Sequence, residues 1–140
     1  MYTNQFMENQ IGEHREYLNH LSSAVIGAAV TVHKEMGPGL LEAVYQLCMV
    51  KELQSRNVAI AQSVPIPLFY KSEPLNKDYI IDLLVENEII IELKAVEGLL
   101  PVHEAQILSY LKLANKKLGF LINFNVPLMK LGFKRYVNGF

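Results

Sequence analysis

The chain has 140 residues and a mass of 15.9 kDa, enough for one domain. Hydrophobic residues make up 51% and charged residues 19%, which indicates a globular protein and excludes a disordered or fibrous chain. The net charge of −1 gives no sign of a nucleic-acid binder over the whole chain. A single cysteine, Cys48, excludes an intramolecular disulfide and a cysteine-based zinc site.

We expect neither a secretion signal nor a membrane-spanning helix. No apolar stretch approaches the roughly 20 residues that a membrane-spanning helix needs. The N-terminus carries acids and amides where a signal peptide has a basic segment followed by an apolar one. We therefore expect a cytoplasmic protein that makes no membrane contact. We also expect residues 1–18 to be flexible and residues 19–140 to form a single domain.

Helical spacing of apolar residues marks the first part of the domain. Leu21, Val25 and Val32 predict a helix over residues 19–35, which Gly37-Pro38-Gly39 ends. A second helix is predicted over residues 40–56. The period then changes, because residues 58–70 are rich in β-formers but contain Pro65 and Pro67. This pattern predicts a kinked strand, or a strand pair, with an unpaired edge.

Two strongly apolar segments form the centre of the predicted sheet. Residues 79–85 and 89–95, separated by Glu86-Asn87-Glu88, predict a β-hairpin that is covered on both faces. A helix is predicted over residues 102–115, and strands over 118–124 and 133–137. The order helix, helix, strands, hairpin, helix, strand, strand predicts an α/β domain with a mixed central β-sheet flanked by helices.

Three charged residues interrupt the apolar hairpin. Asp82 lies between Ile81 and Leu83, while Glu92 and Lys94 are two residues apart and therefore point to the same face of their strand. A three-residue loop at 86–88 would place Asp82 opposite Glu92 on one face. A two-residue loop at Asn87-Glu88 would place Asp82 on the other face. The sequence leaves both registers open.

Two adjacent carboxylates repel, and a divalent cation or a shared proton relieves the repulsion. Mg²⁺ prefers hard oxygen ligands, which two acidic side chains and a backbone carbonyl provide. Metal-assisted phosphodiester hydrolysis follows as a hypothesis, with Lys94 orienting or activating a water. The alternative is a buried salt bridge between Lys94 and the two carboxylates, without chemistry.

Further polar side chains share faces on the predicted helices. Glu42, Tyr45 and Gln46 fall on one face of the second helix, although the helix dipole alone explains a Glu in the first turn. Gln106 and Tyr110 lie one turn apart on the third helix, where a half-exposed polar stripe is the alternative. The four histidines show no pairing at metal-ligand spacing.

Several ordered motifs together resemble a known family. Gly39-Leu-Leu-Glu42-Ala-Val-Tyr45 matches the signature of the GxxExxY protein family. The resemblance covers residues 20–138 and continues through these segments: Val64-Pro-Ile-Pro, Asp82-Leu-Leu-Val, Ile91-Glu92-Leu-Lys94-Ala, Gln106-Ile-Leu-Ser-Tyr110-Leu-Lys and Gly119-Phe-Leu-Ile-Asn-Phe. That family is similar to the PD-(D/E)XK nuclease superfamily.

The resemblance implies a fold and a set of functional residues. The fold is a restriction-endonuclease-like αβββαβ core. Asp82, Glu92 and Lys94 correspond to the Asp and Glu-x-Lys motif, in which the acids hold Mg²⁺ or Mn²⁺ and the lysine assists the attacking water. Glu42 corresponds to the acid of the first core helix, as a further metal ligand or base. Gln106 and Tyr110 correspond to the polar pair of the second core helix.

Two functions follow as hypotheses. The first is a metal-dependent nuclease that acts on DNA in preference to RNA. It would bind nucleic acid through the basic excess of residues 101–140, which consists of Lys112, Lys116, Lys117, Lys130, Lys134 and Arg135. The second is a catalytically inactive interaction module in which the same charges form a buried Asp/Glu–Lys network. The intact acids at every motif favour the first. The near-neutral charge favours the second, or a nuclease that needs a homodimer or a protein partner to hold its substrate.

Overall fold

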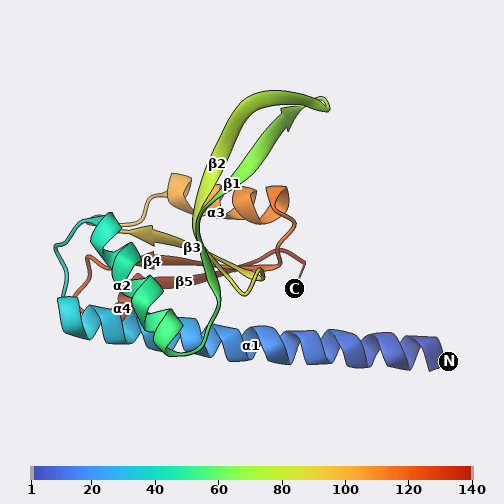
Figure 1. Cartoon of the computed structure of the whole chain (residues 1–140), viewed down its shortest axis with the longest axis horizontal. Coiled ribbons are helices and arrows are strands. Elements are labelled where there is room, and N and C mark those ends of the chain that lie inside the picture. The colour runs from blue at the N-terminus through green and yellow to red at the C-terminus, as the bar shows by residue number, and fades with distance from the viewer. Residues whose placement is uncertain (1, 140) are drawn as a thin grey trace.

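The computed structural model describes residues 2–139, with side chains described from Gln5 onward, and shows one mixed sheet between helices (Figure 1). The helices are α1 (Tyr2–Met36), α2 (Glu42–Ser55), α3 (Pro101–Leu113) and α4 (Met129–Gly132). The strands are β1 (Ile60–Tyr70), β2 (Glu73–Val85), β3 (Ile89–Lys94), β4 (Leu118–Asn123) and β5 (Phe133–Val137). The predicted α/β class is confirmed, and the elements follow the predicted order except for α4, a short helix between β4 and β5 that was not predicted.

The five strands lie in the order β1-β2-β3-β4-β5. Only β3 and β4 are parallel, and α3 connects them on one face of the sheet. Because successive strand residues point to opposite faces, β3 contributes Ile89, Ile91 and Leu93 to the core under α1 and α2. Ile90 joins the second core, under α3. The central hairpin is therefore covered on both faces, as its apolar sequence predicts.

Helix α1 is longer than predicted. The sequence prediction of a flexible segment over residues 1–18 includes Met1, which lies outside the described residues, but the structure is helical from Tyr2. The N-terminal part of α1 extends past the end of the sheet (Figure 1). Phe6, Met7 and Ile11 are exposed there, whereas Leu18 is fully buried. Met7, Ile11 and Leu18 continue the helical spacing of Leu21 and Val25, so the sequence contains a signal for this extension that the prediction did not use.

Strand β2 also begins earlier than predicted, at Glu73 rather than residue 79. Its outer half pairs with β1 in a hairpin, closed at Lys71 and Ser72, that projects from the body of the protein (Figure 1). We call residues 64–81 of this hairpin the arm. Strand β1 is one continuous edge strand with an irregularity between Pro67 and Phe69, not a strand pair. The exposed, polar sequence of the outer half of β2 resembles a loop, which explains the late predicted start.

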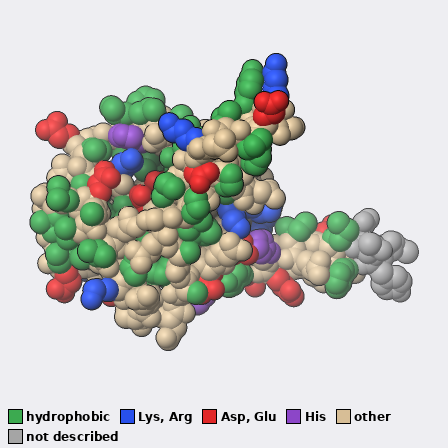
Figure 2. Space-filling view, turned by 45° about the horizontal axis from the view of Figure 1, so that its top comes forward, with side chains coloured by type: hydrophobic (Ala, Val, Ile, Leu, Met, Phe, Trp, Pro, Cys, Tyr) green, Lys and Arg blue, Asp and Glu red, His purple; other side chains and the backbone are tan. Residues whose placement is uncertain are grey.

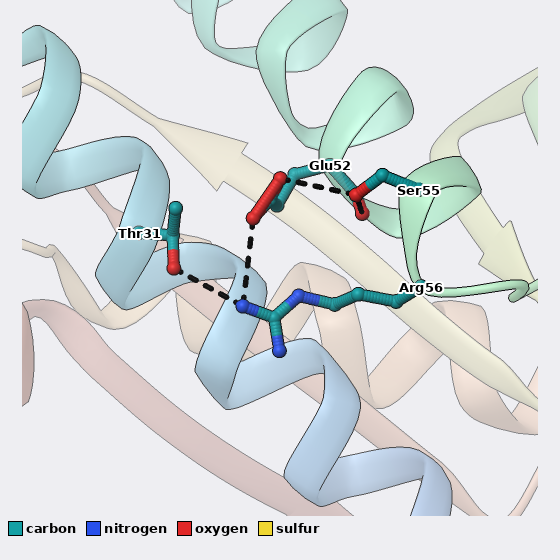
Figure 3. A network of polar contacts seen from close by, with 4 residues as sticks. All are labelled: Thr31, Glu52, Ser55 and Arg56. Carbon is teal, nitrogen blue, oxygen red and sulfur yellow. Dashed lines mark hydrogen bonds and ion pairs between the residues drawn. The ribbon is translucent and has the colours of Figure 1, made fainter.

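A polar network joins α2 to α1 (Figure 3). The Arg56 guanidinium donates to Thr31 Oγ1 at 3.1 Å and forms an ion pair with Glu52 at 3.5 Å. Ser55 donates to the same Glu52 carboxylate at 3.3 Å. These contacts hold the C-terminal end of α2 against α1, and the N-terminal end of α2 is fixed separately at the candidate site.

Candidate active site

Asp82 and Glu92 face each other across β2 and β3. The turn at residues 86–88 has three residues, with positive φ at Glu86 and Asn87, and it pairs Val85 with Ile89. The ladder continues through Leu83 opposite Ile91. The next pair in this register is Asp82 opposite Glu92. The three-residue loop that the sequence left as one of two alternatives is therefore the one adopted.

Where β2 and β3 separate, the carboxylates of Asp82 and Glu92 replace backbone carbonyls as acceptors of hydrogen bonds between the strands. The Asp82 N–H donates to Glu92 Oε1 at 3.1 Å, and the Leu93 N–H donates to Asp82 Oδ2 at 2.8 Å. Each carboxylate thus accepts a hydrogen bond from the opposite strand. On the other side, β1 pairs with β2 at Gln62 and Val64 but not at Ser63, whose φ is 51°. Such irregularities redirect strands near functional sites.

Burial favours the protonated form of this pair. The Glu92 side chain is only 7% exposed, and burial, followed by the charge of Asp82, raises its pKa to about 9. Burial also raises the pKa of Asp82. A hydrogen bond between the two side chains raises the Glu92 pKa and lowers that of Asp82. In the metal-free protein Glu92 therefore keeps its proton at neutral pH.

Lys94 ends β3 on the same face as Glu92. Its charge lowers the pKa of both Asp82 and Glu92, which places the ammonium group close to the pair. Within residues 2–139, however, Lys94 forms no ion pair with either carboxylate. Its backbone carbonyl accepts the Phe124 N–H at 2.9 Å, so the strand end is fixed by the segment after β4. The side chain is half-buried and keeps access to solvent.

Tyr45 fixes the start of α2. Its hydroxyl donates to the Gly37 carbonyl at 2.5 Å and accepts the Leu40 N–H at 3.1 Å. Its ring is fully buried and stacks on Phe124 with centroids 4.4 Å apart. Gly37 and Gly39 have φ of 69° and 97°, a region in which glycine avoids the strain of a side chain. Tyr45 therefore has a structural role that positions the first turn of α2.

Glu42, in that first turn, is exposed, and its charge raises the pKa of Asp82. It does not complete a three-ligand cluster, because residues 2–139 contain no group of three His, Cys, Asp or Glu side chains placed to hold a metal ion. One turn later, Gln46 Nε2 donates to the Asp82 carbonyl oxygen at 3.3 Å. Sequence reasoning placed Gln46 on the face of Glu42 but did not identify this contact.

Helix α3 brings one of its two predicted polar residues against the carboxylates. Tyr110 is half-buried, and burial, followed by the charges of Glu92, Tyr79 and Asp82, raises its pKa. Its ring also contacts that of Tyr79 in β2, a residue that sequence reasoning missed. Gln106 lies one turn earlier and is exposed, without a hydrogen bond to another described residue. Figure 2 shows acidic and basic side chains around a hollow beside the arm.

The donor set suits a small, hard cation. Asp82 and Glu92 present two adjacent carboxylates, and the backbone N–H groups engage only one oxygen of each. The remaining oxygens are available to a cation, and its charge would replace the proton that Glu92 now keeps. Mg²⁺ and Mn²⁺ both fit oxygen ligands of this kind.

The six basic residues of the C-terminal part do not form one surface around the carboxylates. Lys116 contacts Asn87 in the hairpin turn, at the end of the sheet opposite Lys94. Lys134 forms an ion pair with Glu104 at 3.2 Å. Lys112 is on α3, whereas Lys130 is on α4 and lines a pocket with Lys34 of α1, on the other face.

Comparison with known proteins identifies a family. Residues 19–136 match the family model of the PD-(D/E)XK nuclease superfamily. No curated protein matches the chain, and no solved structure matches it. None of the described helices is long and apolar enough to cross a membrane.

Proposed function

The chain belongs to the PD-(D/E)XK nuclease superfamily, and from this premise we propose that it is a metal-dependent nuclease that hydrolyses phosphodiester bonds, with DNA preferred over RNA. The observation that carries the proposal is the Asp82–Glu92 pair. The two carboxylates lie between separating strands, and burial raises the pKa of both. Burying two such acids lowers the stability of the fold. Perturbed acids in such a position are typical of a functional site.

In this proposal Asp82 and Glu92 hold Mg²⁺ or Mn²⁺, and Glu42 serves as a further ligand or as a base. The bound cation would supply a water of lowered pKa and neutralise charge on the phosphate. The Lys94 ammonium lies near both carboxylates and would orient the attacking water by donating a hydrogen bond to it. The polar groups of Tyr110 and Gln106 would hold the substrate phosphate from α3.

The inactive-module alternative needs Lys94 to neutralise the buried acids. The structure has no such ion pair within residues 2–139, and burial raises the pKa of both acids instead. This arrangement favours the nuclease over a salt-bridge network. A homodimer or a protein partner remains part of the proposal as a means of holding the substrate, because the basic residues are dispersed.

The proposal is tested by incubating the purified chain with labelled single-stranded and duplex DNA and RNA. Each substrate is combined with Mg²⁺, Mn²⁺ or EDTA. We expect cleavage that needs the metal and that falls at least 100-fold in Asp82→Asn, Glu92→Gln and Lys94→Met. Glu88→Gln, at the opposite end of the same hairpin, is the matched control and should retain activity. Absence of cleavage for all four substrates, together with a melting temperature indifferent to both metals, would refute the proposal.

A further inference from the structure

Tyr79 lies in the arm, at the end nearer to Asp82. It lies on β2, three residues before Asp82, and pairs with Ile66 of β1 at the base of the arm. Ile66 and Ile81 belong to the core under α3, so this part of the hairpin packs against that helix. The Tyr79 side chain nevertheless remains 41% exposed. It is an aromatic residue at the rim of the candidate site rather than a buried core residue.

The ring of Tyr79 is held in place by Tyr110. The two ring centroids are 5.2 Å apart with an interplanar angle of 58°, a tilted arrangement that aromatic pairs prefer. Tyr110 in turn lies close enough to Glu92 and Asp82 to respond to their charges. The Tyr79 ring therefore packs on a tyrosine that lies near the carboxylates, with part of its own surface open to solvent.

The outer arm carries further exposed aromatic residues. Phe69 and Tyr70 are 62% and 63% exposed, and the Lys71 amine lies 5.5 Å from the centroid of the Tyr70 ring. Figure 2 shows hydrophobic, basic and acidic side chains at the tip of the projecting hairpin. A chain that runs from the carboxylates along the arm would meet Tyr79 first and Tyr70 later, with a cation beside the second ring.

This arrangement fits one form of nucleic acid better than the other. Bases in a duplex are stacked on each other and present only their edges, whereas an unpaired base presents a flat face. Stacking of one base on an aromatic side chain contributes about 1–3 kcal/mol and is tolerant of sequence. Resting on the proposed function, we infer that Tyr79 stacks on an unpaired base beside the scissile phosphate, so that the enzyme acts on single-stranded segments.

The test measures binding separately from cleavage. Fluorescence anisotropy with EDTA present compares a labelled single-stranded oligonucleotide with a hairpin duplex of the same sequence. Tyr79→Ala should weaken single-strand binding at least fivefold and change duplex binding less than twofold. Tyr79→Phe keeps the ring and should bind like the wild type. Tyr17→Ala removes a tyrosine of the same 41% exposure from α1 and is the matched control.

The outcomes distinguish this inference from the proposed function. If the wild type cleaves nucleic acid but Tyr79→Ala binds single strands normally, or loses both substrates equally, only the stacking role is refuted. If the wild type neither cleaves nor binds any nucleic acid, both are refuted. Should Tyr79→Ala not fold, Tyr79→Leu preserves an apolar contact with Tyr110. Leucine must then weaken single-strand binding relative to phenylalanine, and equal affinities would overturn the inference.

Discussion

Glu92 is a buried acid whose ionisation opposes folding in the metal-free protein. Its pKa is raised from 4.5 to about 9, so the folded state keeps its proton over a pH range in which the unfolded chain has lost it. The folded state therefore binds more protons than the unfolded state in that range. The stabilising contribution of the protonated carboxyl is complete below about pH 4.5 and is lost as the pH rises toward 9.

We expect the free energy of unfolding of the metal-free wild type to fall between pH 5 and pH 9, because of this proton difference. Glu92→Gln cannot ionise and should remove most of the decline, becoming more stable than wild type at pH 8 by about 1 kcal/mol or more. Urea denaturation at constant ionic strength across this pH range measures the effect, with Glu88→Gln as control. A mutant about 3 kcal/mol less stable than wild type at pH 8 would instead indicate that Glu92 is the counter-charge of Lys94.

Asp82 and Glu92 are also the proposed metal ligands, so we expect metal binding to release protons. A cation held by Asp82 and Glu92 displaces the proton that Glu92 keeps, so its apparent affinity should rise with pH. We expect the increase in melting temperature with Mg²⁺ or Mn²⁺ to be larger at pH 8.5 than at pH 6.5. Asp82→Asn should abolish the increase at both pH values. A metal response that is independent of pH, or that persists in Asp82→Asn, would place the cation elsewhere.

At the scale of elements, the central hairpin was the most predictable part of the chain. Its strands are apolar on both faces, and the alternation around Glu92 and Lys94 determines which side chains share a face. The sequence could not choose the register, because that choice depends on positive φ at Glu86 and Asn87, and neither residue is glycine. Whether Asp82 lies on the same face as Glu92 thus depended on this one turn.

Elements stabilised by distant contacts were less predictable. The outer half of β2 contains polar residues and Pro74, and only its pairing with β1 makes it a strand. The contact of Tyr79 with Tyr110 joins β2 to α3, and no local pattern indicates it. Glu42 was placed at the start of α2 correctly, but spacing along one helix cannot give its distance from carboxylates on two strands.

The short helix α4 packs closely against the end of β4 at Gly132. A Cβ atom on Gly132 would lie 2.0 Å from the backbone oxygen of Asn123, the last residue of β4. Gly132→Ala must therefore displace α4 or β4, and we expect a loss of about 2–3 kcal/mol in the free energy of unfolding. Gly98→Ala, where a Cβ meets nothing within 4 Å, should change stability by less than about 1 kcal/mol. Equal stabilities of the two variants would contradict the close approach.

For the whole molecule, the distribution of charge limits how nucleic acid is bound. Lys116 and Lys117 precede β4 at the end of the sheet away from Lys94 and contact Asn87 and the Gly139 carbonyl. Lys134 is already paired with Glu104. The basic excess of the C-terminal part is thus spread over both faces and both ends, which a count along the sequence could not reveal.

We accordingly expect charge reversal at both Lys116 and Lys117 to weaken binding of a short oligonucleotide less than threefold at 150 mM salt. The reason is that these lysines are remote from the carboxylates. Lys94→Met, which removes a cation beside them, should have the larger effect. Titrations at several salt concentrations measure both, because each lost phosphate contact lowers the salt dependence of the binding constant by about one unit. A larger loss in the double reversal than in Lys94→Met would place the binding surface at the far end of the sheet.

The two prolines of the edge strand affect whether copies of the protein can associate through that strand. Pro65 and Pro67 pair with Ile80 and Asp78 of β2 and leave the outer side of β1 at the edge of the sheet. Neither proline has an N–H, so a strand from another chain that approached this edge would find two alternate donors absent. Continuous sheet growth from one molecule to the next is thereby blocked along the arm. The projecting hairpin is therefore protected from strand-to-strand association along this edge.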